Sequence, residues 1–484
     1  MVLENILNEL SDEIKKVFPE LEDELKETFN FSVIEQTLAA LVNRFCARIL
    51  EKIITNFLSD PMVLNVLKQI GGHMAMRFKE YRPITIRLYN GQTIKIYSPY
   101  FVKVRSKKRK KKRGPNGTGK HVGLSVIGFI GHASGNFVSE IVKLALLCPS
   151  LEVAHEVLSE RGIQIDVKTI RKYCRELGIL GLENRGEISV DGREELEGQT
   201  LVIGIDGGRL RERKKKRGKK KKGQKRQGYT TEWREPKLFT IYLLNTEGEV
   251  VKEFKPLHDA TMGDADGVFD ILQRYLKALD LSKVKRMVFC GDGATWIWRR
   301  VEGLVGKLGI EEAEIYQVID YTHAKQNLRK IAELIQERDG KREKVYRKWK
   351  RLLWEGDIQA ICESICKNLK GKKKSKALKK WNEYFHENQK RMQYAYFKEN
   401  NIPCGSGCVE SAIRRVINLR LKSAGIFWKR DMAEYFLFLR SQLLSKRWRI
   451  FMNNVTCRLE KFRINQSDSD NHINAESLSD DEAA

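Results

Sequence analysis

Two short stretches decide the fold: LVIGID (residues 201–206) and KRMVFCGD (residues 285–292). Each is an apolar run that ends in an aspartate, Asp206 in the first and Asp292 in the second. Short apolar runs with β-branched side chains favour buried strands. Each predicted strand would therefore deliver one carboxylate at its carboxyl end.

The residues around these runs alternate between strand and helix patterns. In chain order the predicted elements are three strands, a helix, a strand, a helix and a strand, at 201–206, 236–246, 248–257, 265–279, 285–292, 295–308 and 314–320. This is the order of a ribonuclease H-like α/β core, in which the first and fourth strands are neighbours in the sheet. The order predicts that Asp206 and Asp292 meet at one edge of that sheet.

A third carboxylate, Glu410, is placed by a different pattern. After Asp320 the sequence has helical character for about eighty residues, until Pro403 and the turn CGSG interrupt it. A new helix is predicted to begin there, with Ser406 as its N-cap and Glu410 in or near its first turn.

The three carboxylates fit metal-dependent phosphodiester chemistry. Mg²⁺ and Mn²⁺ prefer oxygen ligands, and two ions about 4 Å apart can activate the attacking oxygen and stabilise the leaving oxygen of an in-line displacement. We expect Asp206 to bridge both ions, Asp292 to complete one coordination sphere and Glu410 the other. The alternative is that both aspartates are turn residues, because Asp-Gly is common where strands end.

The charge of the chain favours a polyanionic partner. Its formal net charge is +27, with 90 Lys and Arg against 63 Asp and Glu. Clustered cations release condensed counterions when they bind phosphates, so nucleic acid is the first candidate. The basic runs are glycine-interrupted lysine tracts rather than amphipathic helices, so no membrane partner is expected. The longest, residues 209–227, is predicted to stay disordered until it meets phosphate.

The N-terminal part of the chain predicts three kinds of structure. Residues 1–80 have helical periodicity, and residues 81–120 contain a hairpin with an Asn-Gly turn followed by a basic loop. Gly114 to Lys120 matches most of a phosphate-cradling loop, but His121 replaces the Ser or Thr that would bind magnesium. No nucleotide binding is therefore expected.

Residues 121–195 contain a pattern that resembles a helix-turn-helix. Two short amphipathic helices are predicted at 151–160 and 167–177, with a glycine in the turn. The alternative is an ordinary helical hairpin with a solvated basic face. As a DNA-binding element, the second helix would present Lys168, Thr169, Arg171, Lys172 and Arg175, of which Lys168, Arg171 and Lys172 are the expected DNA contacts.

Other features favour a cytoplasmic protein that associates with the nucleoid. The nine cysteines are scattered rather than arranged as a disulfide framework. The N-terminus lacks the pattern of a signal peptide, and no apolar stretch is long enough to cross a membrane. Residues 464–484 are polar and acidic, which predicts a disordered tail.

Five segments carry a resemblance to a known family. GIDGGRLRER, TEWREPKLF, GDGATWIW, IDYTHAKQNL and IPCGSGCVESAIRRVINLRLKSAGIFW resemble the DDE transposases of bacterial insertion sequences, in particular the Kra-type family and more distantly the Lre-type and Mutator-like ones. The resemblance covers roughly residues 120–450, and its last segment is the most specific. It implies an enzyme that cleaves and joins DNA at the terminal inverted repeats of its own element and in target DNA, as a homodimer or higher oligomer.

The resemblance also implies roles for particular residues. The catalytic and metal-binding triad falls on Asp206, Asp292 and Glu410, with two Mg²⁺ or Mn²⁺ ions in each active site. Asp320 and His323 match a D-x-x-H motif that handles DNA near the active site, although His323 could also be a satisfied histidine on a first helical turn. Further expected DNA contacts are Arg209, Trp296, Arg414, Arg415 and Lys422.

The family pattern divides the chain into a split core and an insertion. Residues 196–324 and 403–463 would form the two parts of the core, and the helices at 325–402 would interrupt it. Two other functions remain open from the sequence. One is a structure-selective nuclease without strand transfer, and the other is a non-catalytic DNA-binding protein derived from a transposase.

Overall fold

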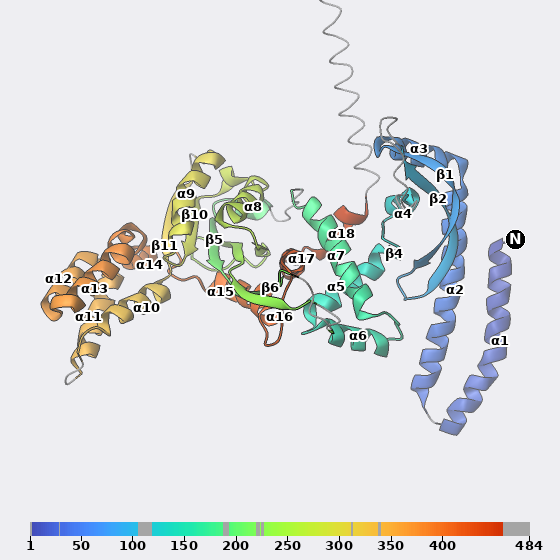
Figure 1. The fold of residues 1–484 in the computed structure, drawn as a ribbon, viewed down its shortest axis with the longest axis horizontal. Coiled ribbons are helices and arrows are strands. Elements are labelled where there is room, and N and C mark those ends of the chain that lie inside the picture. The colour runs from blue at the N-terminus through green and yellow to red at the C-terminus, as the bar shows by residue number, and fades with distance from the viewer. Residues whose placement is uncertain are drawn as a thin grey trace, which may run out of the picture. The chain divides into compact units, whose positions relative to one another are not determined.

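The computed structural model describes residues 2–28, 30–104, 119–186, 193–218, 223, 227–310, 313–336 and 340–457. The predicted acidic tail, most of the basic loop and the distal lysines of the 209–227 tract lie outside these ranges. The chain divides into two compact units, one formed by residues 1–180 with the segment from 450 onward, the other by residues 181–449. Figure 1 labels the helices and strands of both units.

The first unit combines helices with a small four-stranded sheet of order β2-β1-β4-β3. Helix α7 begins in this unit and α18 ends in it. In chain order the elements are α1 (Val2–Thr28), α2 (Phe31–Ser59), α3 (Pro61–His73), β1 (Met76–Arg87), β2 (Thr93–Lys103), α4 (Val122–Val126), β3 (Phe129–Ile130), β4 (Ala133–Ser134), α5 (Gly135–Leu147), α6 (Leu151–Glu160), α7 (Val167–Glu183) and α18 (Trp448–Thr456).

The predicted hairpin is confirmed, but it begins earlier than expected. Strands β1 and β2 pair antiparallel around a turn in which Gly91 has a φ of +83°, a conformation that glycine adopts without steric cost. Helix α3 ends at His73 rather than near residue 80. Ala75 then takes a left-handed φ of 52°, which stops the helix and lets β1 start at Met76.

The two helices of the helix-turn-helix-like pattern are present as α6 and α7. Gly162 has a φ of +75° in the turn, and the Asp166 carboxylate accepts a hydrogen bond from the Thr169 N–H at 2.6 Å. Helix α7 continues to Glu183, further than predicted. The three predicted DNA contacts on α7, Lys168, Arg171 and Lys172, are all exposed.

The last described helix, α18, packs against glycines of the first unit. A Cβ added to Gly128 would lie 3.2 Å from the Thr456 Cβ, and one added to Gly135 would lie 2.6 Å from the Thr456 Cγ2. Helix α18, which carries Thr456, therefore packs against glycines that precede it by more than three hundred residues.

The second unit is built on a five-stranded mixed sheet of order β11-β10-β5-β8-β9. Strands β5, β10 and β11 run parallel, β8 is antiparallel to β5, and β9 is antiparallel to β8. Its elements are β5 (Thr200–Gly207), β6 (Leu210–Lys215), β7 (Tyr229–Arg234), β8 (Lys237–Leu244), β9 (Leu257–Thr261), α8 (Ala265–Lys277), β10 (Arg286–Gly291), α9 (Thr295–Leu308), β11 (Glu314–Ile319), α10 (Tyr321–Ala332), α11 (Lys341–Glu355), α12 (Ile358–Asn368), α13 (Gly371–Lys380), α14 (Tyr394–Glu399), α15 (Gly407–Ile413), α16 (Leu419–Leu421) and α17 (Arg430–Leu444).

The predicted third strand is wrong in position. Of residues 248–257, Val250 forms an isolated bridge with Leu244 after a turn held by the Asn245 side chain, and only Leu257 belongs to a strand, as the first residue of β9. The strand that pairs with β8 is β9, all five of whose residues are buried. Its Asp259 is neutralised by Arg185, whose guanidinium donates at 2.6 Å and 3.0 Å. Because this partner is distant in sequence, the polar segment gave no strand signal.

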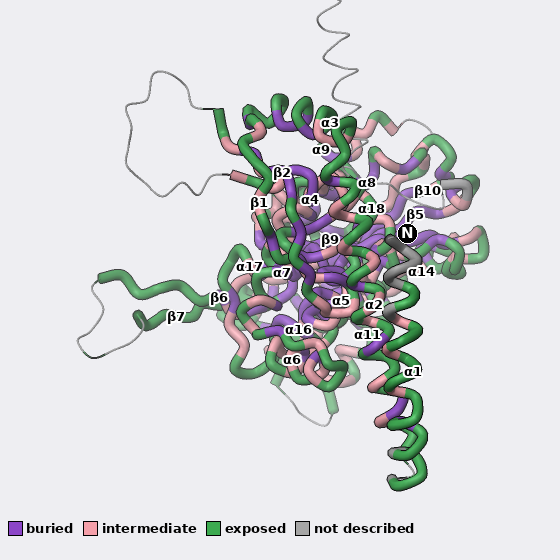
Figure 2. The backbone as a smooth tube through the Cα atoms, turned by 90° about the vertical axis from the view of Figure 1, so that its right-hand side faces the viewer, coloured by how far each residue is buried: buried purple, intermediate pink, exposed green. Residues whose placement is uncertain are grey.

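The prediction that the lysine tract is disordered is wrong for its first part. Leu210–Lys215 forms strand β6, which pairs antiparallel with β7 in a two-stranded ribbon. The backbone ladder supplies the order that the sequence pattern does not reveal, because Lys and Arg are poor strand formers. Figure 2 shows both strands mostly in the colour of exposed residues.

The helices after β11 share one apolar core with the sheet. One cluster of buried apolar residues draws its members from between Leu196 and Ile402 and includes Trp349, Phe385 and Tyr394 from the helical segment. Figure 1 shows α11, α12 and α13 grouped beyond the β11 edge of the sheet. No helix in the described chain combines the length and apolar character needed to span a bilayer.

The helical run that begins at Gly407 contains a π-helical turn at Arg414–Asn418. A π turn leaves backbone carbonyls without their usual partners. The buried Arg440 guanidinium donates to two of them, the carbonyls of Arg415 and Val416. This contact fixes the helix that carries Glu410 onto α17.

Candidate active site

The register of the sheet brings Asp206 and Asp292 together. Strands β5 and β10 are parallel neighbours, and Ile205 is paired with Gly291. Each aspartate is the next residue along its strand, so both lie at the carboxyl end of the sheet on adjacent strands. The prediction that these two strands are neighbours is confirmed.

The turn after β10 is held by contacts to Asp292. Its carboxylate accepts a hydrogen bond from the Ala294 N–H at 2.9 Å, and its carbonyl accepts one from the Trp298 indole N–H at 2.9 Å. A Cβ at Gly293 would meet the Tyr384 ring at 2.0 Å, so only glycine lets this ring pack on the turn. Asp206 has a simpler setting, with Oδ1 accepting from the Gly207 N–H at 2.6 Å.

Glu410 approaches the sheet through close packing of α15 on β5. A Cβ at Gly204 would lie 2.9 Å from the Val409 Cβ, a distance that real Cβ atoms do not reach. Gly204 therefore allows α15 to lie directly on the strand that carries Asp206. Glu410 follows Val409 and is exposed.

Asp320 links the end of β11 to the start of α15. Its buried carboxylate accepts four hydrogen bonds: Oδ1 from the His323 N–H at 2.7 Å and Nδ1 at 3.2 Å, and Oδ2 from the Ser406 N–H at 2.6 Å and hydroxyl at 3.0 Å. A carboxylate offers about four lone-pair positions, so this one is fully used. Asp320 thus acts as a structural tie.

The predicted role of Ser406 needs a correction. Ser406 stands at the N-cap position of α15, but its side chain accepts no capping hydrogen bond. Its hydroxyl is directed to carboxylates instead, 3.0 Å from Asp320 Oδ2 and 3.3 Å from Glu410 Oε1. The neighbouring carboxylate competes successfully for the hydroxyl because it is a stronger acceptor. Ser406 therefore connects Asp320 to Glu410.

His323 lies beside this group of acids. Ligand atoms of Asp320, His323 and Glu410 are within 4.8 Å of one another, close enough to hold a metal ion. The hydrogen bond to Asp320 raises the pKa of His323, and the charges of Asp292 and Asp206 raise it further. Because a carboxylate cannot donate, Nδ1 must carry the proton in that bond, which leaves Nε2 free for another partner.

The electrostatics distinguish two kinds of acid. Burial raises the pKa of Asp206 to about 6, and the charges of Asp292 and Glu410 act in the same direction. Burial would also raise the pKa of Asp320, but the hydrogen bonds from His323 and Ser406 lower it to about 2. Asp206 therefore lies among like charges, whereas the charge of Asp320 is compensated.

The same contrast appears in the free oxygens. Asp206, Asp292 and Glu410 each use one carboxylate oxygen for a hydrogen bond, and the other accepts none from the described part of the chain. Three carboxylates with open oxygens suit hard divalent cations, which would also relieve their mutual repulsion. This donor set fits Mg²⁺ or Mn²⁺. Asp320 does not fit as a ligand unless it gives up hydrogen bonds to His323 or Ser406.

The other predicted DNA contacts divide into two groups. Arg209, Arg414, Arg415 and Lys422 are exposed in the same unit as the three acids. Trp296 is half-buried, lies edge-on to the Phe269 ring at 6.4 Å, and has the Lys237 ammonium 4.4 Å from its ring centroid. Trp296 is therefore largely a packing residue in this structure.

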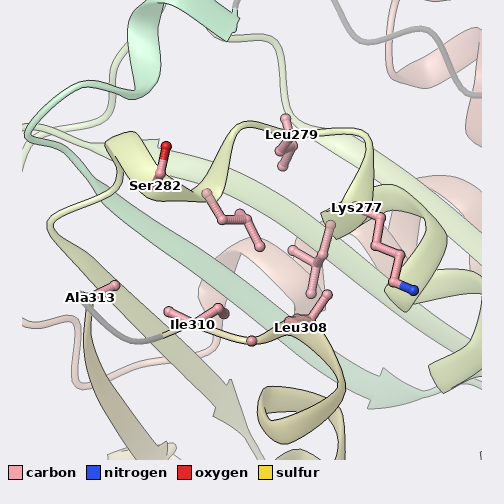
Figure 3. Close-up of a pocket in the computed structure, with 9 residues that line it drawn as sticks. Lys277, Leu279, Ser282, Leu308, Ile310 and Ala313 are labelled. Atoms are coloured by element: carbon pink, nitrogen blue, oxygen red, sulfur yellow. The ribbon is translucent and has the colours of Figure 1, made fainter.

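An apolar pocket in the same unit lies away from the acids. Figure 3 shows residues from the ends of α8 and α9 that line it, among them Leu279, Leu308 and Ile310. These residues lie near the amino ends of β10 and β11, whereas Asp206 and Asp292 lie at the carboxyl ends. Among its lining residues Lys277 is the one charged side chain, so it offers no acid or histidine for catalysis.

Three further residues shape the site. Ser406 is predicted only as a helix cap, and the sequence predicts no role in the site for Tyr384 or Gly204. Gly204 carried a readable signal, since glycine inside a strand often marks the close approach of another segment. The other two depend on contacts between distant segments, which no local pattern reveals.

Comparison with known proteins identifies the family. The chain belongs to the Uncharacterised protein family (UPF0236), whose model matches residues 132–445, a range that includes all three acids. No curated protein matches the chain. A solved structure, the Drosophila P element transposase strand transfer complex, is similar with a TM-score of 0.28 and 10% identity, over 66% of this chain and 93% of that chain. A likeness this distant carries no argument about fold or function.

Proposed function

We propose that this protein is a DDE-type transposase that cleaves and joins DNA strands at the ends of its own insertion sequence. The observation that carries the proposal is that Asp206 and Asp292 lie at the carboxyl ends of the neighbouring strands β5 and β10, while α15, which carries Glu410, packs on β5. Each of the three acids has an open carboxylate oxygen. The formal net charge of +27 supports a nucleic-acid substrate.

The strand order supports a ribonuclease H-like core for this enzyme. In the sheet, β5, β8 and β9 follow one another in antiparallel pairs, and β10 and β11 then add parallel to β5 on its other side. This places β5 in the centre. In the proposed division, residues 196–324 and 403–449 form the core, and the helices at 325–402 form the insertion. The expected core boundary at 463 is shortened because the residues from 450 belong to the first unit. DNA recognition by α6 and α7 remains part of the proposal.

The three acids would hold two Mg²⁺ or Mn²⁺ ions. Asp206 is the best candidate to bridge them, because β5 both pairs with β10 and lies under α15. Bound there, the ions would activate the attacking oxygen and stabilise the leaving oxygen of phosphodiester cleavage and of strand joining.

The neighbouring residues would hold this arrangement and the DNA. Asp320, through Ser406, would fix the start of α15 and so the position of Glu410. The same carboxylate orients His323 and favours its protonated form, in which Nε2 would donate to a phosphate oxygen of the bound strand. Arg209 and Arg414 are exposed in the same unit and would neutralise backbone phosphates.

The test uses the full-length protein and a plasmid that carries the DNA flanking its gene on both sides. With Mg²⁺ we expect strand cleavage at two sites that bracket the gene, followed by joining of the freed 3′-hydroxyl ends to target DNA. Cleavage without joining would instead identify a nuclease. DNA binding without any Mg²⁺-dependent cleavage would identify a non-catalytic DNA-binding protein.

A further inference from the structure

The ribbon formed by β6 and β7 has two chemically different faces. Directly paired residues in an antiparallel ribbon share a face, and successive residues alternate between faces. One face, here called the acid-paired face, carries the pairs Leu210 with Arg234, Glu212 with Glu232, and Lys214 with Thr230. The other, here called the cation-aromatic face, carries the pairs Arg211 with Trp233, Arg213 with Thr231, and Lys215 with Tyr229.

The acid-paired face neutralises its own charges. Lys214 contacts Glu232 at 2.9 Å, and Arg234 contacts Glu232 at 2.6 Å and Glu212 at 3.0 Å. Two cations therefore meet two acids on this face. Nothing about it calls for a charged partner.

The cation-aromatic face has no acid. Arg211, Arg213 and Lys215 form no ion pair with any residue that the structure describes, whereas the cations on the opposite face do. The guanidinium of Arg211 lies 5.6 Å from the Trp233 ring centroid, and that of Arg213 lies 5.9 Å from the Tyr229 centroid. Arg211 also lies 4.6 Å from the Phe427 centroid and donates to the Ser423 carbonyl at 3.2 Å, and Phe427 packs on Tyr229 with ring centroids 5.8 Å apart. This face thus interleaves uncompensated cations with aromatic rings.

The two rings are exposed to solvent. Trp233 retains 59% of its accessible surface and Tyr229 retains 47%. Large aromatic side chains on a lysine-rich ribbon are not needed for its solubility or its backbone ladder. Their exposure beside cations that no acid of the described chain pairs with points to a partner that offers both negative charge and flat apolar surfaces.

The base of the ribbon is fixed next to the candidate active site. The Arg213 N–H donates to the Trp428 carbonyl at 2.8 Å, and the Trp428 N–H donates to the Arg211 carbonyl at 2.9 Å. Strand β6 begins four residues after Asp206, and residue 428 follows the helical run that starts beside Glu410. An extended ligand bound along the ribbon would therefore continue toward Asp206 and Glu410.

We infer that the cation-aromatic face binds an unpaired stretch of a DNA strand. Cations two residues apart along β6 are roughly 6.7 Å apart, which suits successive backbone phosphates. Tyr229 and Trp233 would stack on exposed bases, a contact that tolerates any sequence. Paired bases inside a duplex have no free ring face to offer. The inference rests on the proposed function, since it names the form of DNA held beside the same acids.

The experiment measures binding by full-length protein in EDTA, so that no cleavage occurs. Labelled single-stranded DNA and a duplex of equal length are titrated and followed by fluorescence anisotropy. We expect Trp233→Ala to weaken single-strand binding by about tenfold to a hundredfold and duplex binding by less than about threefold, because only unpaired bases use the ring. Trp233→Phe should restore most of the loss.

Adjacent lysines supply a matched control. Lys215→Ala, on the cation-aromatic face, should weaken single-strand binding several-fold, whereas Lys214→Ala, on the acid-paired face, should not. Equal losses for the two lysines, or single-strand affinity within twofold of wild type for Trp233→Ala, would overturn the inference. Equal loss of duplex affinity in Trp233→Ala would overturn it as well. Because the assay needs no catalysis, its failure leaves the cleavage test intact, and failed cleavage leaves this result readable.

Discussion

The acids on the sheet and the acid on the helix are positioned by different means. Asp206 and Asp292 extend paired strands, so backbone hydrogen bonds between β5 and β10 set their separation. Glu410 depends on side chains, namely the contact of Val409 with Gly204 and the bonds from Ser406 to Asp320. One half of the site is therefore as stable as the sheet, and the other half can shift while the sheet remains folded.

The largest effect should come from removing any open carboxylate. Asp206→Asn, Asp292→Asn and Glu410→Gln should each lower DNA cleavage by roughly 10³-fold or more, because the lost metal interaction is worth several kcal/mol. DNA binding in EDTA should change little. Single-turnover cleavage assays measure the loss. Substantial activity in any one variant would remove that residue from the proposed triad.

Asp320→Asn should weaken the helix-borne half alone. An amide offers one acceptor oxygen where the carboxylate offers two, so it cannot accept from both Ser406 and His323. The side that loses its acceptor weakens the bond network around Glu410. Cleavage should fall by about 10-fold to 100-fold, the usual range for residues that orient metal ligands. The loss should be partly recovered at high Mg²⁺ concentration.

Asp264→Asn is the matched control for this change. Asp264 caps α8 by accepting from the Gly267 N–H at 2.9 Å, and Asn caps helices about as well as Asp. Its cleavage rate should equal that of wild type. If Asp320→Asn were equally silent, the bond network around Ser406 would not position Glu410.

Gly204→Ala should have a smaller effect that tests the packing contact. The added Cβ would lie 2.9 Å from the Val409 Cβ, so α15 must move or the strand must shift. We expect a loss of about 1–3 kcal/mol in the free energy of unfolding and a reduced cleavage rate. Gly303→Ala on α9 is the control, because no atom lies within 4 Å of its added Cβ. That variant should keep full activity and gain slightly in stability.

The smallest effect concerns stability against pH. Because the pKa of Asp206 is raised to about 6, the folded protein binds a proton there more tightly than the unfolded chain. Metal-free wild-type protein should therefore gain stability as the pH falls from 8 toward 5. Asp206→Asn should melt higher than wild type at pH 8 in EDTA and lose this part of the pH dependence.

Saturating Mg²⁺ should reverse that order at pH 8, because only the wild type keeps the full donor set. Thermal melts of both proteins at two pH values, with EDTA or Mg²⁺, give the comparison. An Asp206→Asn variant that melts lower than wild type in EDTA would show that Asp206 is not repelled by its neighbours.

Local patterns in the sequence sufficed for the elements that carry Asp206 and Asp292. Their strands are buried on both faces, so apolar runs mark them clearly, and the order of elements implied their adjacency. β9 was not predicted because it contains a buried aspartate, Asp259. The charge of Asp259 is compensated by Arg185, which is distant in sequence. The β6–β7 ribbon was not predicted because β6 lies in a charged tract without an apolar pattern. Its strands are ordered by backbone pairing with each other.

The site was predictable only where backbone pairing sets it. Glu410 could be proposed from a helix start and a family motif, but its approach to Asp206 requires the contact of α15 with Gly204. The sequence motif associates Asp320 with His323. The two hydrogen bonds that Asp320 accepts from Ser406 join segments more than eighty residues apart, which the motif does not reveal. Such contacts arise from tertiary packing and leave no periodic signal.

The return of the chain to the first unit affects how the protein is made. Residues 1–180 leave the ribosome before the 269 residues of the second unit (449 − 180 = 269), yet Gly128 and Gly135 pack against Thr456. At a typical rate of synthesis the interval is on the order of tens of seconds. A nascent chain would therefore expose the surface beside these glycines to chaperones until helix α18 has been made and can pack there.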